Sequence, residues 1–264
     1  MMKKKLLITG ATAGIGRETA KGLAAEGHDL LVHGRSAEKV EALERELAGG
    51  PGAVEGLVAD LSRMADVEAL AETVLRRHDS LDVLINNAGV FSTAEPLTPE
   101  GRDVRFEVNT VAPYLLSGRL TPILGARGRV VSLSSAAQNP VSLDALRGRV
   151  RLDDFEAYAQ SKLALTMWSA HLGRTAGDRG PIFVAVNPGS MLGTKMVEEA
   201  FGVVGKDVRI GSRILTRLAL GDDAAAQGAY FDNDAGRFAR PHPDALDAAK
   251  CAALVDVIEG LVAS

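Results

Sequence analysis

The chain has 264 residues, of which 46% are hydrophobic and 24% charged, and its 30 basic and 34 acidic side chains give a net charge of −4. This balance is ordinary for a globular protein and lacks the basic excess that indicates nucleic-acid binding. Cys251 is the single cysteine, which excludes an internal disulfide and fits a cytoplasmic setting. The apolar run at 6–8 is too short for a signal peptide, and no later run reaches the ~18 residues of a membrane span.

Short apolar runs alternate with longer helical patterns along the chain. Strands are predicted at or within 5–9, 29–33, 52–60, 81–89, 128–135, 181–189 and 228–232. Helices are predicted at 14–27, 36–49, 64–78, 102–124, 154–176 and 244–262, with a cap at Ser36 and an interruption at Pro113. This order predicts one α/β domain over 1–264, with a parallel sheet and helices on both faces. Segments 137–153 and 189–227 fit the alternation poorly.

The first predicted strand runs into TGATAGIG, which places Gly10, Gly14 and Gly16 before the first helix. Glycine permits a tight turn and lets a phosphate approach the backbone, and the start of a helix favours an anion. The spacing G-x-x-x-G-x-G is not the commoner G-x-G-x-x-G, and turns collect glycine in any case. Because a strand precedes the turn and a helix follows it, we predict a dinucleotide site.

The end of the second strand indicates which dinucleotide is bound. NAD sites place an acid there for the ribose hydroxyls, whereas NADP sites favour an arginine for the 2′-phosphate. Positions 33 and 34 carry no acid, and Arg35 follows them. A solvated surface arginine is the alternative interpretation. We predict NADP as the cofactor, with NADPH preferred and NAD left open.

Tyr158 and Lys162 lie four residues apart in AYAQSKLAL, so a helix would place both on one face. Taken alone, the pair is better explained as an amphipathic residue and a solvated charge on a surface helix. Together with the other motifs, however, the chain resembles the classical short-chain dehydrogenase/reductase family from about Lys5 to Thr194, and in particular its retinol-dehydrogenase-type members. The resemblance rests on TGATAGIG at 9–16, NNAG at 86–89, Asn109, the serines at 134–135, YAQSK at 158–162 and NPG at 187–189.

The resemblance implies a doubly wound Rossmann-type fold with a seven-stranded parallel sheet. It implies an oxidoreductase that moves a hydride between NADP(H) and a carbonyl or secondary alcohol. Tyr158 would be the general acid in reduction and the base in oxidation. Lys162 would bind the nicotinamide ribose and lower the pKa of the phenol from its usual ~10.

Two further catalytic residues follow from the same resemblance. Ser135 would hydrogen-bond the substrate oxygen, with Ser134 as the alternative. Asn109 would hold a water that links Lys162 to solvent, unless it is only a polar residue beside the kink at Pro113.

The resemblance also implies a set of nucleotide contacts. Asp60 would contact the adenine amine or, alternatively, cap the segment that begins at Ser62. Pro188 and Gly189 would turn the chain under the nicotinamide, and Thr194 would bind its carboxamide. The expected cofactor-binding set is Gly10, Thr12, Ala13, Gly14, Ile15, Gly16, Arg35, Asp60, Leu61, Asn87, Ala88, Gly89, Tyr158, Lys162, Pro188, Gly189, Ser190 and Thr194.

The chain departs from the family pattern at two places. Ser135 and Tyr158 are 23 residues apart, about ten more than is usual in the family, so 137–153 is predicted to be an insertion beside the active site. The sequence PGSMLGT reaches its threonine one residue late, so Ser190 is an alternative partner of the carboxamide. Segment 189–227 is predicted to be a substrate lid, although its apolar residues would suit core packing nearly as well.

The remaining polar residues indicate packing or capping. The five histidines show no metal-ligand spacing, so no metal site is predicted, and the acids Asp153 and Asp154 are expected only to favour a helix start. The expected partners are a small carbonyl or alcohol substrate and, through helices 102–124 and 154–176, a homodimer or homotetramer. Two alternative functions stay open: a catalytically inactive nicotinamide-binding regulator and an NAD-dependent epimerase or dehydratase.

Overall fold

The computed structural model describes residues 2–177, 180–221 and 226–263, so residues 222–225 of the predicted lid lie outside the described residues. The strands are β1 (Lys5–Ile8), β2 (Asp29–Gly34), β3 (Val54–Val58), β4 (Val83–Asn86), β5 (Arg129–Leu133), β6 (Ile182–Asn187), β7 (Ala229–Asp232) and β8 (Arg237–Ala239). The helices are α1 (Gly14–Ala25), α2 (Ala37–Leu47), α3 (Met64–Arg77), α4 (Val104–Phe106), the π-helix η1 (Glu107–Val111), α5 (Ala112–Leu124), α6 (Leu143–Leu146), α7 (Asp154–Ala176), α8 (Lys195–Phe201), α9 (Arg209–Leu220), α10 (Pro243–Leu246) and α11 (Ala248–Val262).

The strands form one sheet in the order β3-β2-β1-β4-β5-β6-β7-β8. The seven strands predicted from the sequence pair in parallel, which confirms the doubly wound fold. The predicted strand number was wrong by one, because β8 pairs antiparallel with β7 at the edge. A three-residue strand followed by Arg240 and Pro241 carries too short an apolar pattern to be recognised in the sequence.

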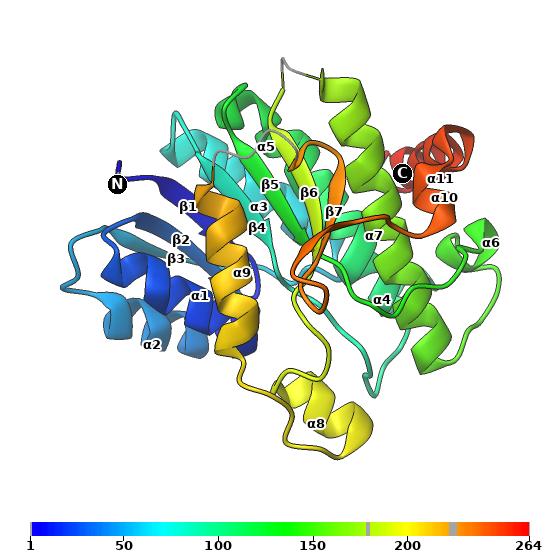
Figure 1. Ribbon diagram of the computed structural model, residues 1–264, viewed down its shortest axis with the longest axis horizontal. Coiled ribbons are helices and arrows are strands. Elements are labelled where there is room, and N and C mark those ends of the chain that lie inside the picture. The colour runs from blue at the N-terminus through cyan, green and yellow to red at the C-terminus, as the bar shows by residue number, and fades with distance from the viewer. Residues whose placement is uncertain (1, 178–179, 222–225, 264) are drawn as a thin grey trace.

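The buried strands divide their side chains between two cores, one on each face of the sheet. In β1, Leu6 and Ile8 belong to one core and Leu7 to the other, as the alternation of side chains along a strand requires. Helices α1, α2 and α9 cover one face, and α3, α5 and α7 cover the other (Figure 1). Trp168 of α7 is fully buried, so it is a core residue.

The chain order reverses between β1 and β4, which are neighbours in the sheet. In open α/β sheets, ligands bind at the carboxyl ends of the strands beside such a reversal. Helix α8 lies at one end of the molecule, apart from the helical layers (Figure 1). The same end receives the loops that carry most of the predicted site residues.

The predicted helix 102–124 is three consecutive segments, with the π-helix η1 between α4 and α5. Pro113 has no N–H to donate to the carbonyl of Asn109 four residues earlier, so the α-helical pattern cannot continue through this point. The interruption therefore lies before Pro113 rather than at it. Single-turn π-helices of this kind often mark functional sites.

Candidate functional site

The glycine-rich turn joins β1 to α1 and leaves the start of the helix open. Gly10 and Gly14 have φ of 63° and 53°, which favour glycine because other side chains are strained there. Ala13 is the N-cap and has no polar side chain to satisfy the first N–H groups of α1, and the first turn contains no acid. These N–H groups and the positive end of the helix dipole suit a phosphate.

The loop after β4 braces this turn. The side-chain amide of Asn87 donates to the carbonyls of Thr9 and Gly10 at 2.9 and 3.0 Å. A Cβ at Gly16 would lie 2.4 Å from the Asn87 amide nitrogen and 2.4 Å from the carbonyl oxygen of Gly10. Glycine at position 16 therefore allows the helix to pack directly against the loop, where no side chain fits.

His33 supports the same turn from β2. Its Nδ1 accepts a hydrogen bond from the Gly10 N–H at 3.3 Å, and its Nε2 lies 3.1 Å from the carbonyl oxygen of Ala59. Burial lowers the pKa of His33 to about 4, so the ring is neutral at physiological pH. The prediction that this histidine is a packing residue agrees with these contacts.

A cavity of about 260 Å³ extends from the end of β2 toward α8. Arg35 and Asp60 line it, together with Gly89 and residues of the 90–93 loop and α8. Asp60 accepts hydrogen bonds from the Ser62 N–H and hydroxyl at 3.0 and 2.8 Å, which hold the turn before α3; it does not cap the helix, whose N-cap is Arg63. The second carboxylate oxygen of Asp60 and the exposed guanidinium of Arg35 take no part in the two hydrogen bonds to Ser62.

The predicted catalytic pair projects from α7 beside the end of β5. The Lys162 side chain is 3% exposed, and its ammonium donates to the carbonyl of Leu133 at 2.7 Å. The ammonium lies 5.7 Å from the centre of the Tyr158 ring and 3.4 Å from the position that a Cβ at Gly89 would occupy. The structure thus brings Tyr158, Lys162 and the NNAG loop together.

The two serines after β5 have different surroundings. The Ser134 hydroxyl is buried between the Lys162 carbonyl oxygen at 3.1 Å and the Thr166 hydroxyl at 2.7 Å. Ser135 is the serine whose side chain lies near enough to the phenol of Tyr158 to oppose the rise in the phenol pKa. Its carbonyl oxygen accepts a bond from the Tyr230 hydroxyl at 3.1 Å, which fixes the loop.

Asn109 lies in the π-helix and is fully buried. Its amide donates to the Val90 carbonyl oxygen and to the Ser161 hydroxyl, each at 2.9 Å, and its Oδ1 accepts from the Val90 N–H at 2.8 Å. It therefore joins the 90–93 loop to α7 directly beside Lys162. These three hydrogen bonds are more than the alternative interpretation, a polar residue beside the kink at Pro113, would require.

Burial dominates the protonation of the pair in the protein alone. It lowers the pKa of Lys162 to about 7 and raises the pKa of Tyr158, although the side chain of Ser135 opposes the latter. Burial therefore outweighs any effect of Lys162 on the phenol pKa here, and the expectation that Lys162 lowers this pKa together with a bound nicotinamide stays a prediction. The physical reason that burial outweighs Lys162 is that the ammonium is turned toward the Leu133 carbonyl and is itself desolvated.

The turn after β6 is held by the hairpin that follows β7. Asp234 accepts bonds from the Ser190 N–H at 3.0 Å and from its hydroxyl at 2.6 Å. Asn233 donates to the Pro188 carbonyl oxygen at 2.8 Å. Thr194 caps α8, and its methyl group lies 3.5 Å from a Cβ built on Gly14, so the segment crosses above the glycine-rich turn.

The predicted insertion packs along α7. Asn139 donates to Glu156 at 2.8 Å, and the Ser142 N–H donates to Gln160 at 3.0 Å. Short helix α6 contributes Leu146 to the core. The segment thus borders the start of the helix that carries Tyr158.

Sequence reasoning missed two polar contacts between distant residues. Arg105 is buried and pairs with Asp103 and Asp154. Asp154 was expected only to favour the start of α7, and that prediction was incomplete, because Asp153 caps the helix while Asp154 binds the arginine. The bonds of Asp234 were also missed. Both contacts join residues more than 40 positions apart, so neither has a local signal.

These features fit a dinucleotide, because an open helix start, a cavity and a buried cation lie at the carboxyl ends of adjacent strands. The family model described as "short chain dehydrogenase" matches residues 4–202. The chain belongs to the short-chain dehydrogenase/reductase family. Among the described residues of this short-chain dehydrogenase/reductase, no group of acids, histidines or cysteine is suited to a metal ion. In the same described part, no helix is long and apolar enough to cross a bilayer.

Characterised and solved relatives agree with this membership. Human retinol dehydrogenase 13 is 29% identical over 92% of this chain and 80% of its own length. The crystal structure of an uncharacterised protein from Mycobacterium paratuberculosis is 29% identical with a TM-score of 0.81, over 99% of this chain and 94% of that one. A metagenomic short-chain oxidoreductase solved with NADP is 30% identical with a TM-score of 0.65, over 84% and 92% of the two chains.

Proposed function

We propose that the protein is an NADP(H)-dependent oxidoreductase that interconverts a carbonyl and a secondary alcohol, with Tyr158 as general acid and base. The observation that carries the proposal is the meeting of Tyr158, Ser135 and Lys162 beside Gly89. A proton donor, a second hydroxyl and a buried cation lie where the fold receives a nicotinamide. When bound, the nicotinamide supplies or accepts the hydride.

The nucleotide would be held by groups on three loops. The open N–H groups at Gly14–Gly16 suit the pyrophosphate, and Arg35 suits the 2′-phosphate because its guanidinium matches a phosphate with several donors. Asp60 and Leu61 would border the adenine, Asn87 to Gly89 the ribose, and Pro188 to Thr194 the nicotinamide. NADP in the metagenomic relative supports the preference for NADP(H).

The proton moves at the phenol of Tyr158. In reduction, Tyr158 would give its proton to the substrate oxygen while Ser135 holds that oxygen in a hydrogen bond. Burial raises the pKa of Tyr158, which keeps the phenol in the protonated form that reduction requires. Lys162 would bind the ribose hydroxyls, and Asn109 would hold a water on the path from Lys162 to solvent.

We further propose that the substrate is small and apolar and that 189–221 forms most of its lid. Met191 is partly exposed, and the Met196 side chain reaches within 3.8 Å of a Cβ built on Gly89. Flexible methionines can adapt to apolar ligands of different shapes. The name of the human relative, retinol dehydrogenase 13, fits an apolar alcohol. The insertion at 137–153 would form another wall of the same pocket.

The two alternative functions explain less of this geometry. An inactive regulator would not need the side chains of Ser135 and Tyr158 next to each other beside a buried lysine. An epimerase or dehydratase of related fold would carry a different glycine spacing and a separate substrate region. We retain one domain, a cytoplasmic location and a homo-oligomer as predictions. Packing of α11 against α7 and the Tyr114–Glu259 bond occupy part of the helix face expected in the oligomer.

The proposal is tested by following NADPH oxidation with a panel of apolar aldehydes and ketones. The wild-type protein is expected to reduce at least one compound, and Tyr158→Phe is expected to bind NADPH normally with turnover reduced about a hundredfold or more. Ser134→Ala serves as the control for Ser135→Ala, because the Ser134 hydroxyl bonds to Thr166 and to the Lys162 carbonyl, whereas Ser135 lies beside the phenol. Full turnover in Tyr158→Phe would overturn the proposal.

A further inference from the structure

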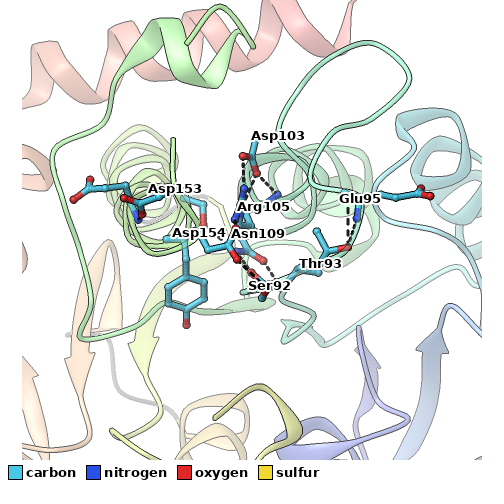
Figure 2. Close-up of polar contacts among 12 residues, drawn as sticks. Ser92, Thr93, Glu95, Asp103, Arg105, Asn109, Asp153 and Asp154 are labelled. Carbon is cyan, nitrogen blue, oxygen red and sulfur yellow. Dashed lines mark hydrogen bonds and ion pairs between the residues drawn. The ribbon is translucent and has the colours of Figure 1, made fainter. Parts of the chain in front are cut away.

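A buried ion pair joins the helix start of α7 to the segment that precedes Asn109. The Arg105 side chain is 2% exposed and donates to both oxygens of Asp103, at 2.8 and 2.7 Å. Its remaining nitrogen donates to Asp154, the first residue of α7, as Figure 2 shows. One guanidinium therefore connects α4 to α7, one turn before Asn109 on one side and one turn before Tyr158 on the other.

Asp154 also reaches the loop that follows β4. Its second oxygen accepts a hydrogen bond from the Ser92 hydroxyl at 2.9 Å (Figure 2). Two residues earlier in this loop, the backbone of Val90 is bound on both sides by the Asn109 amide, at 2.8 and 2.9 Å. Residues 90 and 92 are thus each tied to another element, and Phe91 lies between them.

Phe91 contacts the predicted acid directly. Its ring centre is 4.9 Å from that of Tyr158, with the two planes at 54°. An aromatic neighbour in this tilted arrangement restricts where the phenol ring can lie. Because the phenol must reach both Ser135 and the substrate oxygen, displacement of Phe91 would change the geometry of proton transfer.

We propose that Arg105, Asp154 and Ser92 are positioning residues that hold Phe91 against the ring of Tyr158, and that this contact fixes the phenol for proton transfer. The inference rests on the proposed function of Tyr158. A role in stability alone would not require the Ser92 bond, since Ser92 is exposed and Arg105 already has Asp103 as a partner. We call Arg105, Asp154 and Ser92 the clamp. The Asp154 carboxylate is half-exposed, so Asp154→Asn weakens the clamp by removing a negative charge with little change in side-chain volume.

The test combines Asp154→Asn, Ser92→Ala and Phe91→Leu with the double variant Asp154→Asn/Phe91→Leu. Glu68→Gln is the matched control, because it breaks another ion pair between helices, to Arg119, that involves no residue of the loop after β4. We expect Asp154→Asn and Phe91→Leu each to lower kcat about tenfold with an unchanged NADPH Kd. The double variant is expected to lose no more than the larger single change, because both act through one contact.

A second readout does not depend on activity. The chain has three tyrosines, so tyrosine labelled with ¹³C at the ζ carbon gives three signals, and Tyr158→Phe assigns the relevant one. Phe91→Leu and Asp154→Asn are expected to shift the Tyr158 signal in the same direction, Ser92→Ala less so, and Glu68→Gln not at all.

An unmoved Tyr158 signal in both Asp154→Asn and Ser92→Ala would overturn the proposal, as would additive losses of kcat in the double variant. If the wild-type protein turned over no carbonyl, the proposed function would fail. The labelled signal would still decide whether the clamp positions the phenol.

Discussion

Lys162 is expected to destabilise the folded protein at neutral pH. Its side chain is 3% exposed, and burial lowers its pKa from 10.5 to about 7. Between these two values the unfolded chain binds a proton at this site that the folded chain does not, so the free energy of unfolding rises with pH from about 7 to 10.5. Over that interval the effect amounts to roughly 5 kcal/mol.

Lys162→Met removes this group and keeps most of its length. The carbonyl of Leu133 loses a hydrogen bond, which returns about 1–3 kcal/mol of the gain. We therefore expect the variant to be more stable than the wild type by roughly 2–4 kcal/mol near pH 7, although it should not turn over. The advantage should shrink by up to ~1.4 kcal/mol for each pH unit above that.

Urea unfolding of both proteins without nucleotide, at about pH 7, 8 and 9, measures this difference. Lys39→Met, at an exposed position of α2, controls for the loss of one positive charge. A difference in the free energy of unfolding between Lys162→Met and wild type that stayed constant with pH would contradict this prediction. It would show that burial does not lower the pKa of this lysine.

Three further variants, one of them with a matched control, test the supports of the site. Gly16→Ala is expected to lower the free energy of unfolding by about 1–3 kcal/mol and to weaken NADPH binding. Its control, Gly22→Ala, has open space at the new Cβ and should raise the free energy of unfolding by about 0.5–1 kcal/mol. Urea unfolding measures both changes. Asp234→Asn should weaken NADPH binding about tenfold in a fluorescence titration, because it loosens the Ser190 turn; unchanged affinity would remove Asp234 from the account. The pKa of His33 is about 4, so acidification from about pH 6.5 to 4 should lower the free energy of unfolding of the wild type by roughly 3 kcal/mol more than that of His33→Gln. Equal losses in the two proteins would contradict a buried neutral ring.

The fold was predictable because its signals are local. Buried runs such as Leu6 to Ile8 and the glycines at 10–16 occupy a few consecutive positions, and each constrains the chain on its own. The bond of Ser36 to the Lys39 N–H, which starts α2, belongs to the same class. Strand β8 was missed because it is stabilised by pairing with β7 rather than by a pattern of its own.

The supports of the candidate site were not predictable, because they join distant parts of the chain. In the sequence GRDVRFEVN, nothing distinguishes Arg105 from an ordinary surface charge. Only the packing of α4 against α7 brings it to Asp154. Likewise, Asp234 lies in a turn that resembles any polar turn until the hairpin folds back to Ser190. Whether the pKa of Tyr158 is raised or lowered also depends on burial, and a sequence motif does not specify how deeply a side chain is buried.

The most direct test of the central claim is a fluorescence titration of the purified protein with NADPH and with NADH. We predict that NADPH binds at least about tenfold tighter than NADH and that Arg35→Ala removes the preference, because the guanidinium would bind the 2′-phosphate. Equal affinities for the two nucleotides would contradict the role of Arg35 but would leave the proposed oxidoreductase activity standing. Binding of neither nucleotide would contradict the proposed oxidoreductase.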